Sequence, residues 1–238
     1  FYFNNYTLNK NRFAMNKIIT FIFSFLFIIT PAFAKINYNI KFPKAEILSK
    51  YTTRIPFKLI DRLIVIEAEI LQQKGNFIID TGSETLILNK IHFPSKYSHN
   101  KKNKTTYGVN KFIDNPFEKS IQEFNLQNFV LKNIKSDVID LSHIEKSKKI
   151  HLLGIIGYSI LKDYEIFIDL HLNQITLSKV DKFGNKLDPN VYLEKIVDSI
   201  QFKLKNHTIV LNCLVQNKPV KFGLDTGAEF NQINKSVD

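Results

Sequence analysis

The residues best suited to chemistry in this sequence are two identical triplets, Asp80-Thr81-Gly82 and Asp225-Thr226-Gly227. In each, an apolar run ends in the aspartate, so a strand would hold the carboxylate at its end. The glycine allows a sharp turn that brings backbone amides near the carboxylate, and the threonine hydroxyl can fix the loop by hydrogen bonds. We therefore predict Asp80 and Asp225 as catalytic, with a set of loop-supporting neighbours: Thr81, Gly82, Ser83, Thr226, Gly227 and Ala228.

Two such loops facing each other would bring two carboxylates within reach of one water molecule. Because like charges at that distance do not both ionise easily, the pair would share one proton. The ionised carboxylate would act as general base toward the water, and the protonated one as general acid toward a peptide carbonyl and then the leaving amine. The two groups titrate together, so the sequence does not say which aspartate is the base.

Placing the two triplets in register also aligns the segments around them without a gap. The apolar and charged positions before the first triplet match those before the second, with Ile55, Phe57, Lys58, Leu59 and Phe77 opposite Ile200, Phe202, Lys203, Leu204 and Phe222. An internal repeat of this length predicts two copies of one small β lobe. Strands are expected at 57–59, 63–70 and 76–79, and again at 202–204, 208–215 and 221–224, with polar hairpin turns at 72–75 and 216–218. Residues 129–131, 136–141 and 165–177 continue the β pattern. The helical pattern is weak, with a single turn expected at 159–162.

Residues 15–34 have the features of an export signal. Lys17 gives the positive end, Ile18 to Ile29 form the apolar run, and Ala32-Phe33-Ala34 is a small-x-small cleavage site. The run is shorter than the roughly 20 apolar residues that span a bilayer, so a cleaved signal is favoured over a retained anchor. We expect an exported product, periplasmic or extracellular, with no stable membrane span after cleavage and a mature chain that begins at Lys35.

The remaining organisation follows from the repeat. We expect residues 1–14 to be an upstream segment outside the mature protein, 35–52 an N-terminal linker, 53–180 a first lobe, 181–198 a connector, and 199–238 an incomplete second lobe.

Composition excludes several other classes of function. With 44% hydrophobic and 23% charged residues, the chain can form a folded core. Its net charge is +11, but the Lys-rich run at 101–104 lacks the interleaved aromatic residues that stack on nucleic acid bases. We expect no nucleic acid partner. The single Cys213 excludes an internal disulfide, and the six histidines lack a local metal-ligand spacing, so neither cofactor nor metal is expected. His151 is interpreted as a surface or packing residue and Asp169 as a hairpin residue.

Beyond the triplets, the sequence resembles the retropepsin-like aspartyl proteases, in particular the bacterial exported type with two lobes in one chain. Leu152-Leu153-Gly154-Ile155-Ile156-Gly157 resembles the family's glycine element, in which Gly154 and Gly157 would support the catalytic loop from behind. Residues 158–162 resemble its short helix, and 167–170 with 174–177 its closing hairpin. The resemblance covers residues 53–178, and 199–235 as the opening of a second lobe. It implies a mainly β fold, a retropepsin-like acid protease barrel with one complete lobe plus the start of a second.

The same resemblance implies a β-hairpin flap over the substrate, for which residues 105–109 lie in the right interval with Gly108 as the possible tip. The sequence departs from the family after Ala228, where ten residues remain and no second glycine element follows. We therefore expect a truncated second lobe, a poorly held Asp225, and weak or no peptidase activity of this chain.

Three functions stay open at this point. The first is an aspartic endopeptidase that hydrolyses extended peptide or protein substrates. The second is a non-catalytic β-rich envelope module that binds peptides or a partner protein, in which the two triplets are structural turns. The third, not favoured, is a homodimer whose site combines Asp80 from two chains.

Overall fold

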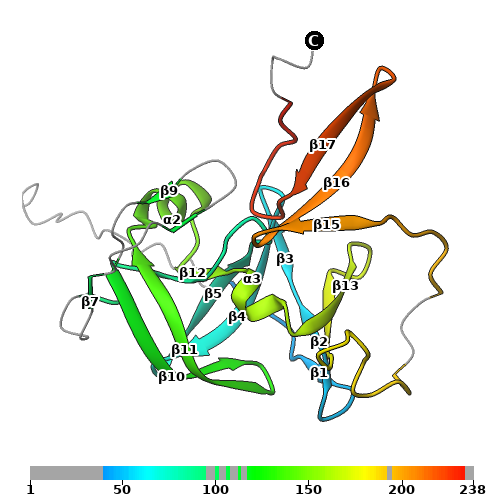
Figure 1. Ribbon diagram of the computed structural model, residues 1–238. Coiled ribbons are helices and arrows are strands. Elements are labelled where there is room, and N and C mark those ends of the chain that lie inside the picture. The colour runs from blue at the N-terminus through cyan, green and yellow to red at the C-terminus, as the bar shows by residue number, and fades with distance from the viewer. Residues whose placement is uncertain are drawn as a thin grey trace, which may run out of the picture. The chain divides into compact units, whose positions relative to one another are not determined.

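The computed structural model describes residues 40–94, 100–101, 106–107, 112–113, 117–191 and 195–233, and these are mostly β-strands (Figure 1). The largest sheet runs in the order β3 (Lys58–Ile60), β4 (Leu63–Ile70), β5 (Gln73–Ile79), β12 (Leu152–Ile156), β6 (Leu86–Asn89), β11 (Phe129–Ile139), β10 (Phe117–Leu126), β7 (Asn100–Lys101). An additional pairing of β4 with β10 closes six of these strands, β4 to β10 in that order, into a barrel. The predicted mainly β fold class is confirmed.

A second sheet contains the start and the end of the first sequence copy. Its order is β1 (Glu46–Ile47), β2 (Thr52–Pro56), β14 (Gln174–Lys179), β13 (Tyr164–Asp169). The β13–β14 hairpin, paired from Tyr164↔Lys179 to Asp169↔Gln174, is the closing hairpin expected from the sequence. Strand β2 pairs antiparallel with β14, so residues more than a hundred positions apart hold this part of the chain together.

The core follows from the alternation of side chains along the strands, which puts successive residues on opposite faces. On β4, Ile64, Ile66, Ala68 and Ile70 belong to the main core cluster. Leu63 and Val65 belong to a second cluster on the other face, against which Ile144 of the helix α2 (Ser142–Lys148) packs. Since β4 is buried on both faces, the strand is nearly continuously apolar, and so the period-two pattern of a half-exposed strand is absent.

The described residues contain two helices. The helix α3 (Tyr158–Leu161) lies at the expected helical turn, shifted by one residue. The helix α2 (Ser142–Lys148) was not predicted, because its sequence is polar and none of its side chains is fully buried. It ends at Lys149, whose φ of 53° is left-handed, without the glycine that usually marks such an end.

The second sequence copy forms its own antiparallel sheet of β15 (Phe202–Lys205), β16 (Thr208–Val215) and β17 (Lys218–Leu224), in orange to red in Figure 1. It repeats the meander of β3, β4 and β5, down to the turns. Leu71 and Gln72 have φ of 50° and 63°, and Gln216 and Asn217 have φ of 50° and 62°. Positive φ at both central residues is typical of a two-residue hairpin turn. The first turn was expected at 72–75, but Gln73 to Gly75 lie within β5.

The two copies differ in burial. The strands of the first copy are covered by the rest of the barrel, whereas large apolar residues of the second remain exposed: Phe202, Leu204, Leu214 and Leu224. These apolar side chains of the second sheet are therefore left uncovered among the described residues.

A short hairpin of β8 (Thr106–Tyr107) and β9 (Phe112–Ile113) lies in the interval where a flap was expected. Its proposed tip, Gly108, lies outside the described residues, as does the proposed export signal at 15–34. Within the described ranges, no helix is both long and apolar enough to cross a membrane.

Candidate active site

Each Asp-Thr-Gly triplet begins where a strand ends, after Ile79 of β5 and after Leu224 of β17. In the first loop, Asp80 Oδ1 accepts hydrogen bonds from the backbone N–H groups of Gly82 (2.8 Å) and Ser83 (3.1 Å). In the second, Asp225 Oδ1 accepts one from Gly227 N–H (2.9 Å). The two loops therefore fold in the same way, and each orients its own carboxylate with backbone donors.

The two threonines join the loops reciprocally. Thr81 N–H donates to Thr226 Oγ1 (3.0 Å), and Thr226 N–H donates to Thr81 Oγ1 (3.1 Å). Each hydroxyl in turn donates to the end of the opposite strand, Thr81 to the Leu224 carbonyl (3.1 Å) and Thr226 to the Ile79 carbonyl (2.8 Å). These four bonds correct the expectation that Asp225 is poorly held, because they fix its loop to the barrel independently of a second glycine element.

The glycines let the loops approach each other this closely. A Cβ atom added to Gly82 would lie 2.5 Å from Asp225 Cγ, and one added to Gly227 would lie 2.5 Å from Asp80 Oδ2. Each glycine thus faces the aspartate of the other loop. No larger residue fits at either position without moving a carboxylate.

The structure brings the carboxyls of Asp80 and Asp225 together, each against the glycine of the other loop. Burial raises the pKa of Asp80 from its ordinary 3.8 to about 7, with further contributions from the negative charge of Asp225 and from the hydrogen bond between the two side chains. The Gly82 and Ser83 N–H groups act in the opposite direction. A carboxyl that keeps its proton beside another carboxylate is the arrangement that general acid–base catalysis by such a pair requires.

The glycine element lies behind the first loop. In β12, Gly154 pairs with Phe77 of β5, and a side chain there would collide with the Ile87 carbonyl oxygen. The Asp80 N–H donates to the Ile156 carbonyl (3.0 Å), so the end of β12 directly supports the aspartate. After Gly157, Tyr158 N–H donates to the Ser83 carbonyl (2.8 Å), which ties α3 to the loop.

The two residues that follow the triplets differ in environment. Ser83 is buried under this element, whereas its counterpart Ala228 is exposed. The difference follows from the absence, within residues 195–233, of strands that cover the second loop.

The structure adds residues that the sequence analysis missed. The Asn206–His207 turn of the second copy lies at the position of the Asp61–Arg62 turn of the first. His207 Nε2 lies 3.2 Å from the Gly82 carbonyl, and Arg62 Nη1 donates to the Glu229 carbonyl at 3.4 Å. Equivalent turns therefore each reach the loop of the opposite copy, and the in-register repeat was the pattern that could have identified them.

A cavity of about 290 Å³ lies beside the aspartate pair. Asp80 and Gly227 form one side, and α2 contributes the other, in which Lys148 Nζ binds Glu229 Oε1 (2.6 Å) and Asp61 Oδ2 (3.0 Å). The cavity is also lined by Leu63, Ile78, His143, Ile144, Ser147 and Ile155. A larger cavity of about 590 Å³, near Pro43 and Asn173, contains none of the predicted site residues.

Asp169 and Cys213 both lie where a structural role is expected, one in a hairpin turn and the other within a strand. Asp169 Oδ1 accepts hydrogen bonds from the His171 and Leu172 N–H groups (both 2.8 Å) and so closes the β13–β14 turn. Cys213 is a free thiol within β16, opposite Val220 of β17.

Comparison with known proteins gives limited similarity. No family model matches the chain, and no curated protein matches it. Among solved structures, the crystal structure of a retropepsin-like aspartic protease from Rickettsia conorii is similar, with 17% sequence identity and a TM-score of 0.40 over 58% of this chain and 96% of that chain.

Proposed function

We propose that this chain is an aspartic endopeptidase of the retropepsin-like kind, with Asp80 and Asp225 as its catalytic pair. The observation that supports this most strongly is the pair itself: two carboxyls from two sequence copies, each packed against the glycine of the other loop, with the pKa of Asp80 raised to about 7. The reciprocal threonine bonds give a reason for that geometry to persist in solution.

The chemistry follows from one shared proton. The ionised carboxylate removes a proton from a water molecule as its oxygen attacks the peptide carbonyl carbon, while the protonated carboxyl gives its proton to the carbonyl oxygen. As the tetrahedral intermediate collapses, one of its hydroxyls returns a proton to the ionised carboxylate, the C–N bond breaks, and the leaving amine takes the proton of the other carboxyl. The products are a new carboxylic acid, which ionises in water, and a new amine, and the pair is again singly protonated.

The substrate class follows from the same site. Extended peptides suit a cleft between two β lobes, because main-chain hydrogen bonds give affinity and alternate side chains give specificity. We also propose export to the periplasm or the extracellular space, supported by the sequence of residues 15–34.

The second candidate is a non-catalytic envelope module that binds peptides. The exposed apolar face of the second sheet favours a binding role, since Phe202, Leu204 and Leu224 share that face and are each about half exposed. The homodimer alternative has less support, because the pair forms within one chain.

The test is digestion of a mixed peptide library by the full chain, with the products identified by mass spectrometry. The exposed second sheet leads us to expect slow turnover, so the incubation is long and the same digestion with Asp80→Asn serves as the baseline. We expect new termini at internal peptide bonds, suppressed by a statine-containing peptide that mimics the tetrahedral intermediate. Cleavage no greater than that of Asp80→Asn would reject the peptidase and favour the binding module.

A further inference from the structure

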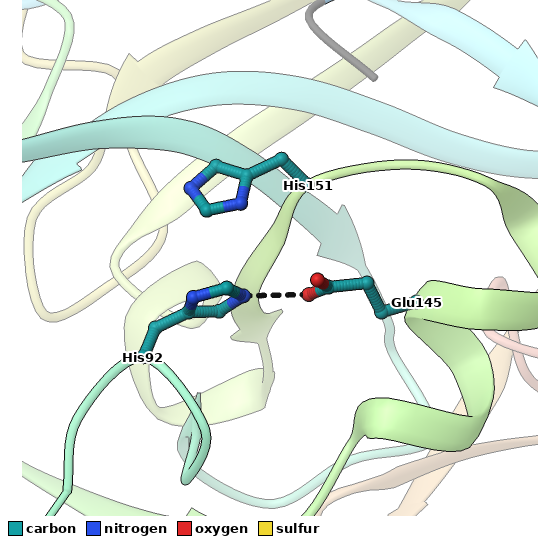
Figure 2. A group of neighbouring side chains, drawn as sticks. All are labelled: His92, Glu145 and His151. Atoms are coloured by element: carbon teal, nitrogen blue, oxygen red, sulfur yellow. Dashed lines mark hydrogen bonds and ion pairs between the residues drawn. The ribbon is translucent and has the colours of Figure 1, made fainter. Parts of the chain in front are cut away.

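Three side chains that the aspartate pair does not use converge on one point beside α2 (Figure 2). His92 lies in the turn after β6, Glu145 lies on α2, and His151 directly precedes β12. One ligand atom of each lies within 4.8 Å of the others, and all three side chains are half-buried. His92 Nε2 is 2.6 Å from Glu145 Oε2, and the two imidazole rings meet edge to face with centroids 4.4 Å apart.

The carboxylate at the centre of this cluster is oriented by a buried partner. Glu145 Oε2 accepts hydrogen bonds from Asn89 Nδ2 and from Leu152 N–H, both at 3.1 Å. Asn89 is fully buried and is fixed in turn, since it donates to the Leu152 carbonyl (2.9 Å) and accepts from Leu141 N–H (3.1 Å). Outer partners that fix a ligating carboxylate in this way are typical of metal sites.

The backbone at the second histidine is also fixed. The His151 carbonyl accepts hydrogen bonds from Asn76 Nδ2 (2.8 Å) and Asn76 N–H (3.3 Å). An ion pair between His92 and Glu145 alone would explain two members of the cluster. It does not explain why a second imidazole is held against the first at the same carboxylate.

We propose that His92, Glu145 and His151 bind one divalent transition-metal ion, with Zn²⁺ as the best fit. Two imidazole nitrogens and one carboxylate oxygen are a donor set that zinc accepts, with a fourth position left for water. Zinc–ligand distances of about 2.0–2.2 Å in a tetrahedral site require ligand atoms about 3.3–3.6 Å apart. Ligand atoms that already lie within 4.8 Å of one another reach this spacing by small side-chain rotations, with the ion replacing the His92–Glu145 contact.

The choice of ion follows from the ligand atoms. Mg²⁺ and Ca²⁺ prefer sites made of oxygen, with six or more ligands, and two of the three donors here are nitrogen. The proposal differs from the expectation from sequence, in which no metal was foreseen. An ion at this point would connect three elements, and one of them, α2, forms a wall of the cavity beside Asp80.

Isothermal titration of the full chain with zinc chloride tests the proposal. The protein is made without a histidine tag, treated with a chelator and desalted, and magnesium chloride serves as the comparison ion. We expect one zinc ion per chain and no saturable heat from magnesium. The double variant His92→Ala/His151→Ala is expected to bind zinc at least about 100-fold more weakly, because one donor atom remains.

A matched control is His171→Ala, which removes an exposed histidine from the β13–β14 turn and is expected to bind zinc like the unchanged chain. Glu145→Gln is the second variant: its amide oxygen still accepts the bonds from Asn89 and Leu152, while the charge that attracts the cation is gone. We expect at least about tenfold weaker binding for it. If circular dichroism shows that the double variant does not fold, the zinc affinity of Glu145→Gln decides whether the three residues bind the ion.

Absence of stoichiometric zinc binding by the unchanged chain would overturn the proposal. So would equal affinity of the unchanged chain and Glu145→Gln. The readout is the heat of binding, so the metal site and the peptidase activity succeed or fail independently.

Discussion

Asp80→Asn and Asp225→Asn should each lower kcat/KM for peptide hydrolysis by about 10²–10⁴-fold. Either substitution removes one member of a pair in which one carboxyl takes a proton from water and the other gives one to the carbonyl. Asparagine keeps the size of the side chain and an oxygen that can accept the Gly82 or Gly227 N–H bond. The loss would therefore report on proton transfer. The measurement is the initial rate on a peptide identified in the library digestion.

Asp169→Asn is the matched control. Asp169 accepts two backbone N–H bonds in the β13–β14 turn, which asparagine can also accept, and it takes no part in the pair. Its rate should equal that of the unchanged chain. Hydrolysis that persists in Asp225→Asn but not in Asp80→Asn would contradict a site built from both copies and would favour Asp80 acting with another chain.

The second large effect is expected for Gly82→Ala and Gly227→Ala. An added Cβ at Gly82 would lie 2.5 Å from Asp225 Cγ, well inside contact distance, so the Asp225 carboxyl would have to move. A displacement of about 1 Å at a catalytic group costs on the order of 100-fold in rate. We therefore expect at least about a 100-fold loss of kcat/KM for either variant. Gly82 and Gly227 both lie outside the strands, so circular dichroism should show the β fold unchanged.

Gly184→Ala separates this steric effect from the general cost of replacing glycine. Gly184 has a φ of 87°, and nothing lies within 4 Å of a Cβ built there. Because of this positive φ, alanine at that position should cost about 1–2 kcal/mol in stability and leave the rate unchanged. A Gly82→Ala variant as fast as the unchanged chain would show that the two loops do not pack as described.

The central features of the site could be predicted because they recur in the sequence. The in-register repeat placed Asp80 and Asp225 at the ends of equivalent strands, and the structure pairs them. The reciprocal bonds of Thr81 and Thr226 could not be derived, because they depend on how two separate meanders meet. For the same reason the sequence led to a wrong expectation about how firmly Asp225 is held.

The barrel was only partly predictable. Strand β11 runs unbroken from Phe129 to Ile139, although the apolar pattern predicted strands only at 129–131 and 136–141. Lys132 is exposed and polar, so its place in the strand comes from its pairing with Glu123 of β10, whereas the paired register skips Asn133, whose φ is 54°. The closing contact of β10 with β4 likewise joins residues distant in sequence, which no local pattern reveals.

Long-range placement also explains the missed histidine cluster. His92 lies 53 positions before Glu145, so no short spacing relates them. Glu145 lies on α2, whose polar sequence has no apolar periodicity that would identify it as a helix. Only the turn after β6 and the approach of β12 bring the three side chains together.

The account depends most on Asp80 and Asp225 acting as one pair, and an NMR titration of carbon-13-labelled aspartate side chains tests this directly. In the unchanged chain the Asp80 carboxyl should titrate far above its ordinary 3.8, at about 7. In Asp225→Asn its pKa should be lower, because the neighbouring negative charge is gone while burial remains. An Asp80 carboxyl that titrates near its ordinary value, or equally in both proteins, would contradict the pair.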